Sequence, residues 1–155
     1  QNAMGNGLSA ASGMSNKQFT QNEITRRLSI RLAGEAVQAG QMQGLALEKI
    51  AGVEPDQWLA AARELTGAAN DTPVLDELEA RMLAQSERMS DSARPSMGQD
   101  MIKGRRTEIE FLNGLVVQRA TELGLAAPAN AGLIAAVQSV ERGEAPAGIE
   151  RVQNI

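Results

Sequence analysis

A dense group of polar side chains between residues 95 and 130 could do chemistry. It offers hydroxyl, guanidinium, carboxylate and amide groups, on Ser96, Arg105, Arg106, Thr107, Glu108 and Asn113. A hydroxyl and a carboxylate also suit a helix start, where they cap free amides and complement the helix dipole. Arginines suit surface carboxylates and a cofactor phosphate equally well. The residue types leave two interpretations open, a binding site and an ordinary polar helix start.

A second polar pair stands at the beginning of the chain. Asn2 and Asn6 are four residues apart, so both amides would project from one side of a helix. Residues 1–11 have no N-cap and no first turn, and are typical of the last turns of a helix that began earlier. An alternative interpretation takes Gln1–Ala3 as a purification remnant ahead of Met4.

Histidine and cysteine are absent, and their absence excludes several classes of catalytic and metal-binding site. A Ser-His or Cys-His nucleophile pair and the usual zinc ligands cannot be formed. Carboxylates and three lysines, Lys17, Lys49 and Lys103, are the acid and base candidates. Because no EF-hand spacing is present either, we predict no metal site. Catalysis by this chain alone is disfavoured.

The composition is that of an ordinary globular protein, with 43% apolar and 22% charged residues. At 155 residues, one domain is expected. The net charge of −4 lacks the basic face that nucleic-acid binding needs, so that class is disfavoured. No apolar run approaches the roughly 20 residues of a membrane span. Without cysteine, a cytoplasmic location is the default prediction.

Helices must position these residues, because apolar residues recur at helical spacing and no stretch alternates with a period of two. The 2% aromatic content favours helix-on-helix packing over sheets. We therefore predict an all-α multi-helix bundle, with Trp58 as a core anchor rather than a ligand platform. Helices are predicted at 1–11, 20–43, from 55, from 72, 96–104, 107–124 and 130–141.

The ends of these elements are predicted from local signals. Asn130 is predicted as an N-cap, 12–19 as a turn, 86–95 as an extended connection and 144–155 as a loose tail. Capping boxes are predicted for the pairs Thr20 and Glu23, Ser96 and Gln99, and Thr107 and Glu110.

Two separated stretches resemble one family. One has three segments, S-M-x-Q-D, G-R-x-T-E-I-E-x-x-N-G-x-V-V and G-x-x-x-P-x-N, and the other is N-x-x-x-N-x-L-x-A-x-x-G near the start. They comprise Ser96, Met97, Gln99, Asp100, Gly104, Arg105, Thr107, Glu108, Ile109, Glu110, Asn113, Gly114, Val116, Val117, Gly124, Pro128 and Asn130, and Asn2, Asn6, Leu8, Ala10 and Gly13. In order and separation they resemble the C-terminal domain of ketopantoate reductases, a helical domain like that of 6-phosphogluconate dehydrogenase-like proteins.

The resemblance implies a two-domain NADPH-dependent oxidoreductase. In this family a Rossmann domain binds NADPH, and the helical domain closes over it. A hydride reduces 2-dehydropantoate to pantoate, for pantothenate biosynthesis. The implied substrate-binding residues are Asn2 and Asn6 at the hydroxyl and keto side, Ser96 at the carboxylate, and Asn16. Glu108 is implied at the mouth of the site, against the cofactor.

Two departures from the family follow from the same resemblance. The family's catalytic lysine lies one helical turn before the first asparagine, a position that would precede Gln1. The Rossmann domain with its G-x-G-x-x-G fingerprint is not in the sequence. We therefore expect a C-terminal fragment, cut just inside its first helix, with no catalytic residue and no activity of its own.

Alternatives to this interpretation stay open. Within the class, the protein could be a related reductase of another 2-keto acid. In a different class, it could be a non-catalytic helical module for dimerisation or partner binding. The expected partners are a 2-keto acid, the protein's own Rossmann domain and, in one alternative, a second copy of the chain.

Overall fold

The computed structural model describes residues 2–68 and 73–155, and within them the protein is all-α, as predicted. Gln1 and the predicted helix start at Thr72 lie outside the described residues. No strand forms in the described ranges, where residues 50 and 53 make an isolated bridge. None of the described helices is both long enough and apolar enough to span a bilayer. The elements are α1 (Asn2–Ser12), α2 (Asn16–Gln21), α3 (Glu23–Met42), α4 (Pro55–Leu65), α5 (Leu75–Ser86), α6 (Ser96–Ile102), α7 (Ile109–Glu122), α8 (Pro128–Glu141) and the 3-10 helix η1 (Ile149–Arg151).

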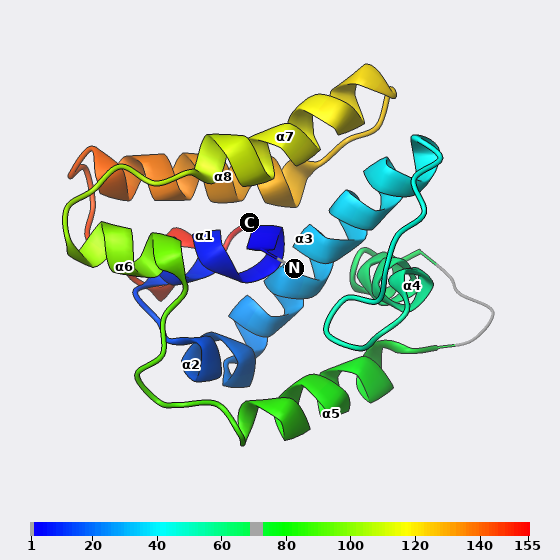
Figure 1. Ribbon diagram of the computed structural model, residues 1–155, viewed down its shortest axis with the longest axis horizontal. Helices are drawn as coiled ribbons and strands as arrows, with labels where there is room; N and C mark the ends of the chain where they lie inside the picture. Colours follow the sequence, from blue (N-terminus) through cyan, green and yellow to red (C-terminus); the bar gives the residue numbers. More distant parts are fainter. Residues whose placement is uncertain (1, 69–72) are drawn as a thin grey trace.

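Helix α1 is the central element of the fold. It contacts α2, α3, α6, α7, α8 and η1. Figure 1 shows α7 and α8 side by side across the top of the view, with the long α3 descending diagonally past α1. Helices α4 and α5 contact each other, and α3 and α2 connect them to the rest of the molecule. The first helix, which carries Asn2 and Asn6, is therefore surrounded by most of the bundle.

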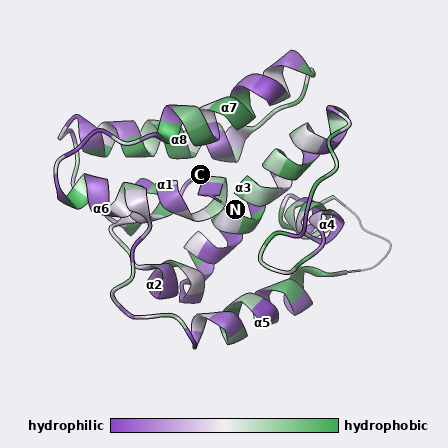
Figure 2. Cartoon of the chain, viewed as in Figure 1, coloured by the Kyte–Doolittle hydropathy of each residue, from purple (hydrophilic) through white to green (hydrophobic). Residues whose placement is uncertain are grey.

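Two main clusters of apolar side chains form the core. The longer helices alternate between hydrophobic and hydrophilic positions along their length, as amphipathic helices do (Figure 2). One cluster joins α1, α3, α6, α7 and α8 through side chains such as Leu8, Leu32, Met97, Ile109 and Leu133. The other joins α3, α4 and α5 around Trp58. This side chain is 1% exposed and its indole N–H donates to the Ile50 carbonyl at 3.1 Å, so the predicted core anchor is confirmed.

Two glycines let neighbouring helices approach α1 closely. A Cβ on Gly7 would lie 2.8 Å from side-chain atoms of Ile109 and Leu133. A Cβ on Gly98, in α6, would collide with the hydroxyl of Ser9. Real Cβ contacts are longer, so any larger residue would force the facing side chains or the helices themselves to shift. The two glycines thereby fix how near α6, α7 and α8 lie to the row of asparagines on α1.

The predicted capping boxes are wrong, and a different one forms. Gln99 donates to the Arg94 carbonyl, and Glu110 accepts from Gln138. The observed box pairs Ser15 with Gln18 and starts α2, which the sequence analysis took for a turn. The pattern S/T-x-x-E/Q is short enough to recur by chance, and it caps only where the backbone turns into a helix.

Thr20 and Asn130 also differ from their predicted capping roles. Thr20 lies inside α2, and the side chain of Asn22 caps α3 instead. Helix α8 begins at Pro128, so Asn130 is inside the helix and fully buried. The Glu35 carboxylate on α3 caps α8, accepting from the amides of Ala129 at 2.8 Å and Asn130 at 2.9 Å.

Residues 144–155 pack against the bundle, which corrects the prediction of a loose tail. The Gly148 amide donates to the Ala11 carbonyl at 3.0 Å. Val152 is 1% exposed within the first core cluster, and Arg31 donates to the Ile155 carbonyl. The apolar residues here are too few and too irregular to show a helical period, so this packing could not be predicted from local pattern.

Candidate functional site

A cavity of about 220 Å³ lies between α1, α2, α3, α4 and α5. Three predicted site residues, Asn2 and Asn6 of α1 and Asn16 of α2, line it together. Asn2 and Asn6 are one helical turn apart on α1, and Asn16 is the first residue of α2. This placement lets all three side chains share one wall. The remaining wall comprises Met4, Gly5, Phe19, Thr20, Ser29, Ala51, Trp58, Met82, Gln85, Met89 and Pro95.

Ser96 reaches this site from α6. Its hydroxyl oxygen lies 3.5 Å from the side-chain nitrogen of Asn6, at the long end for a hydrogen bond. No other hydrogen bond holds the side chains of Asn2, Asn6, Asn16 or Ser96 among the described residues, so their polar groups are available to a ligand. The close α1–α6 approach at Gly98 accounts for this proximity, because Gly98 is two residues from Ser96.

The start of α2 is held by the connection between α5 and α6. The Asn16 amide donates to the Ala93 carbonyl at 2.9 Å. The Arg94 guanidinium donates to the Gly13 carbonyl at 3.0 and 3.3 Å. With the Ser15 capping box, these bonds fix the turn that points Asn16 toward α1.

Glu108 is not brought into the cavity. It stands at the N-cap of α7, exposed, and makes no side-chain cap. The next residue, Ile109, packs against Gly7 on α1, so Glu108 lies at the edge of the same helix layer. The structure therefore groups four of the five predicted residues and leaves the fifth outside.

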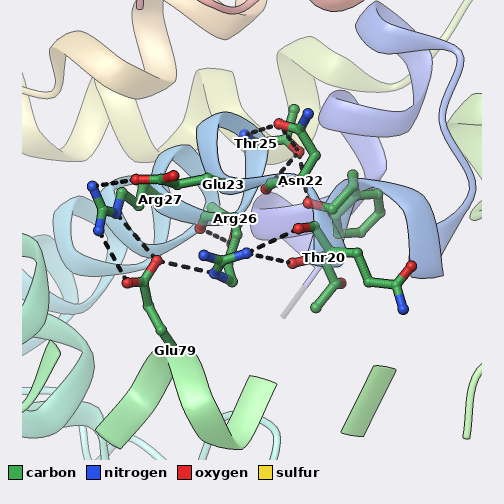
Figure 3. Close-up of polar contacts among 10 residues, drawn as sticks. Thr20, Asn22, Glu23, Thr25, Arg26, Arg27 and Glu79 are labelled. Atoms are coloured by element: carbon green, nitrogen blue, oxygen red, sulfur yellow. Dashed lines mark hydrogen bonds and ion pairs between the residues drawn. The ribbon is translucent and has the colours of Figure 1, made fainter. Parts of the chain in front are cut away.

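Every residue lining the cavity is uncharged. The nearest buried charges are behind its wall, where Arg26 of α3 donates to Glu79 of α5 at 2.9 Å and to the Thr20 carbonyl at 3.3 Å (Figure 3). Arg27 also donates to Glu79, at 3.2 and 3.3 Å. Burial acts to raise the pKa of Glu79, but the hydrogen bonds and charges of Arg27 and Arg26 outweigh it, so the pKa is lowered. This cluster joins α2, α3 and α5, which carry three sides of the cavity.

The cavity has an apolar part that the sequence analysis did not assign to a site. Phe19, Met82 and Met89 line it, and Trp58 contributes to the wall as well as to the core. Such residues carry no sequence signal beyond apolar character, which predicts core and pocket walls alike. Only the packing of α2, α4 and α5 around α1 shows which of these apolar residues face the cavity.

Fold and cavity together define a class, an all-α domain whose cavity combines free amides with an apolar wall. The family model "Ketopantoate reductase PanE/ApbA C terminal" matches residues 1–141. The chain belongs to this family, the C-terminal domain of ketopantoate reductases.

Individual relatives agree with this assignment. The chain is 40% identical over 65 residues to a 2-dehydropantoate 2-reductase of Archaeoglobus fulgidus, covering 42% of this chain and 21% of that protein. It thus spans about a fifth of the length of that curated relative.

Solved structures show the same fold. A D-mandelate dehydrogenase with NADH and anilino(oxo)acetate gives a TM-score of 0.64 at 19% identity, over 92% of this chain and 38% of that one. A dimeric ketopantoate reductase from Staphylococcus aureus gives 0.62 at 16% identity, over 93% and 41%. A PanE/ApbA family ketopantoate reductase from Ralstonia eutropha JMP134 gives 0.52 at 24% identity, over 92% and 39%.

Proposed function

We propose that this chain is the substrate-binding domain of a ketopantoate reductase-like oxidoreductase that reduces 2-dehydropantoate to pantoate with NADPH in pantothenate biosynthesis. The supporting observation is that Asn2, Asn6 and Asn16 line one cavity, with Ser96 3.5 Å from Asn6. The family membership of the chain makes an oxidoreductase the fitting context.

The roles follow from the chemistry of the four side chains. An amide both donates and accepts hydrogen bonds, so Asn2, Asn6 and Asn16 suit a ligand that carries a keto oxygen and a hydroxyl. The Ser96 hydroxyl, at the edge of this row, donates to the substrate carboxylate. Uncharged donors orient the substrate without the cost of burying protein charge.

NADPH, when bound, supplies the hydride, and in this proposal a nucleotide-binding domain holds most of it. In this proposal Glu108, which is exposed at the start of α7 and outside the cavity, contacts the cofactor ribose or nicotinamide. Because no charged residue lines the cavity, the proton for the new hydroxyl must come from outside the described wall. We propose the family's lysine, one helical turn before Asn2. The 155-residue chain alone should then oxidise no NADPH.

A related reductase of another 2-keto acid is the second candidate. The apolar wall at Phe19, Trp58 and Met82 would suit a substrate with a bulky apolar tail. The fold of the D-mandelate dehydrogenase, whose complex contains anilino(oxo)acetate, fits the same idea.

Two further assignments belong to this proposal. A homodimer would parallel the Staphylococcus aureus ketopantoate reductase, which is dimeric. A cytoplasmic location would place the protein with the reduced cofactor that it uses.

The test joins this domain to the nucleotide-binding domain that the proposal requires and follows NADPH absorbance. We expect turnover of 2-dehydropantoate, and slower turnover of a phenyl-substituted 2-oxo acid; the reverse preference would favour the second candidate. Asn6→Ala should raise the KM for the keto acid about fivefold, since a hydrogen bond to substrate is worth about 1 kcal/mol. The exposed Asn154→Ala is the matched control. No reduction of any 2-oxo acid would reject the proposal.

A further inference from the structure

A network of buried, hydrogen-bonded side chains runs from α3 through α8 and α7 to α1. Glu35 accepts from the side-chain nitrogen of Asn130 at 2.7 Å. The side-chain oxygen of Asn130 accepts from Asn113 at 2.8 Å, and Asn113 donates its second N–H to the carbonyl of Ala3 at 2.8 Å. Asn113 and Asn130 are both fully buried. The network thus ends on the residue that follows Asn2.

The direction of this network is fixed by its partners. Asn130 also donates to the Leu32 carbonyl at 3.3 Å, so its nitrogen faces two acceptors and its oxygen faces Asn113. The nitrogen of Asn113 likewise faces two acceptors, and its own oxygen is buried with no partner in the described residues. A reversed amide at either position would set acceptor against acceptor. Asn113 therefore donates both of its side-chain N–H groups, and its side-chain oxygen is left without a hydrogen-bond partner.

The segment of α1 that carries Asn2 and Asn6 has little intrinsic preference for a helix. Gly5 and Gly7 lie within it or next to it, and each costs about 1 kcal/mol relative to alanine in a helix. Packing favours both glycines. A Cβ on Gly7 would lie 2.8 Å from Ile109, and a Cβ on Gly5 would lie 3.0 Å from Phe19, so these side chains would have to shift. The segment that carries Asn2 and Asn6 therefore needs contacts from other helices to fix its position.

We propose that Asn113 is a positioning residue for the substrate site, which holds the Ala3 carbonyl and thereby aims the amides of Asn2 and Asn6. The inference rests on the proposed function for its catalytic consequence. It assigns a task to an asparagine that helix packing alone does not need, because a leucine has the same branched heavy-atom skeleton and would leave no unsatisfied oxygen of its own.

The experiment compares Asn113→Leu with a matched control, Ala120→Gly, in the domain joined to its nucleotide-binding domain. Ala120 is on the same helix and buried, but it belongs to a separate small cluster away from α1. Both variants should lower Tm. We expect N113L to raise the KM for the 2-oxo acid at least tenfold with the KM for NADPH within twofold, and A120G to leave both within twofold.

Amide hydrogen exchange gives a readout that needs no turnover. N113L should accelerate exchange in residues 4–8 at least tenfold more than in α4, whereas A120G should not. Unchanged exchange in α1, or accelerated exchange with an unchanged KM in an active enzyme, overturns the inference. If the parent protein reduces no 2-oxo acid, the proposed function fails and exchange alone decides the positioning role. Should N113L not fold, Asn113→Ser, which shortens the donor, carries the same comparison.

Discussion

At the residue scale, the site is built from polar groups that the protein leaves free. Asn2 and Asn16 line the cavity without a side-chain hydrogen bond in the described ranges, and Asn6 and Ser96 share a long one. Asn2 is exposed and Asn6 and Asn16 are half-buried, so their amides are open to solvent and to a ligand. Asn113 and Asn130 differ from them, because their side-chain nitrogens donate to partners inside the protein.

Ser96→Ala tests the carboxylate contact directly. Loss of a hydrogen bond to a charged group costs about 1.5–3 kcal/mol, so the KM for the keto acid should rise about tenfold or more. Steady-state kinetics of the two-domain protein measures this KM, and the exposed Ser90→Ala is the control. An unchanged KM would remove Ser96 from the site.

The motif residues were the predictable part of the site. A resemblance to the family pointed to Asn2, Asn6, Asn16 and Ser96, and the structure brings them together. Their roles toward substrate, and that of Glu108 toward cofactor, stay predictions. The apolar wall could not be predicted, because an apolar residue in a helix looks the same whether it faces core or cavity.

At the element scale, helix starts are capped by other helices. Glu35 of α3 caps α8, and the Glu64 carboxylate of α4 accepts from the Val74 amide at 2.7 Å, just before α5. Free amides at a helix start accept any correctly placed oxygen, local or distant. A local sequence pattern does not reveal a distant partner, and the four caps predicted at Thr20, Ser96, Thr107 and Asn130 are wrong.

Gly98→Ala tests the close α1–α6 approach. The new methyl group would collide with the Ser9 hydroxyl, so we expect destabilisation of about 1–3 kcal/mol. Denaturant unfolding measures it. Gly114→Ala in α7 is the control, since its Cβ would lie 3.6 Å from Glu110, and it should be neutral or stabilising. Equal effects of both changes would contradict the packing argument.

The Glu79 cluster predicts a pH dependence of stability. The folded-state pKa of Glu79 lies below its ordinary value of 4.5, so the unfolded chain binds the proton more readily. The stabilisation is complete above about pH 4.5 and is lost as the pH falls through the lowered pKa. Glu79→Gln should cost about 2 kcal/mol at pH 7, because a hydrogen-bonded charge is lost.

Urea unfolding between pH 3 and pH 7 checks this expectation. The difference between wild type and Glu79→Gln should shrink toward low pH, where the wild-type carboxyl is also neutral. The exposed Glu77→Gln on the same helix is the control and should follow the wild-type curve. A difference that stays constant with pH would assign the loss to packing instead of charge.

At the scale of the whole molecule, the C-terminal segment completes the bundle. Val152 inserts into the first core cluster beside helices that belong to the site. Val152→Ala removes two buried methyl groups and should lower the free energy of unfolding by about 2 kcal/mol. Thermal unfolding measures it, and the exposed Gln153→Ala should leave Tm within about 1 °C. No change for Val152→Ala would restore the loose-tail prediction.

The sequence by itself determined the all-α class, the buried anchor at Trp58 and the motif residues, because helical periodicity and residue type are local properties of the chain. The tertiary structure decided which side chains meet: the convergence of Asn2, Asn6, Asn16 and Ser96, the caps from Glu35 and Glu64, and the packing of residues 144–155. These contacts join residues as far apart as Ala11 and Gly148. Their free energy depends on helix-to-helix distance, which a local pattern does not encode.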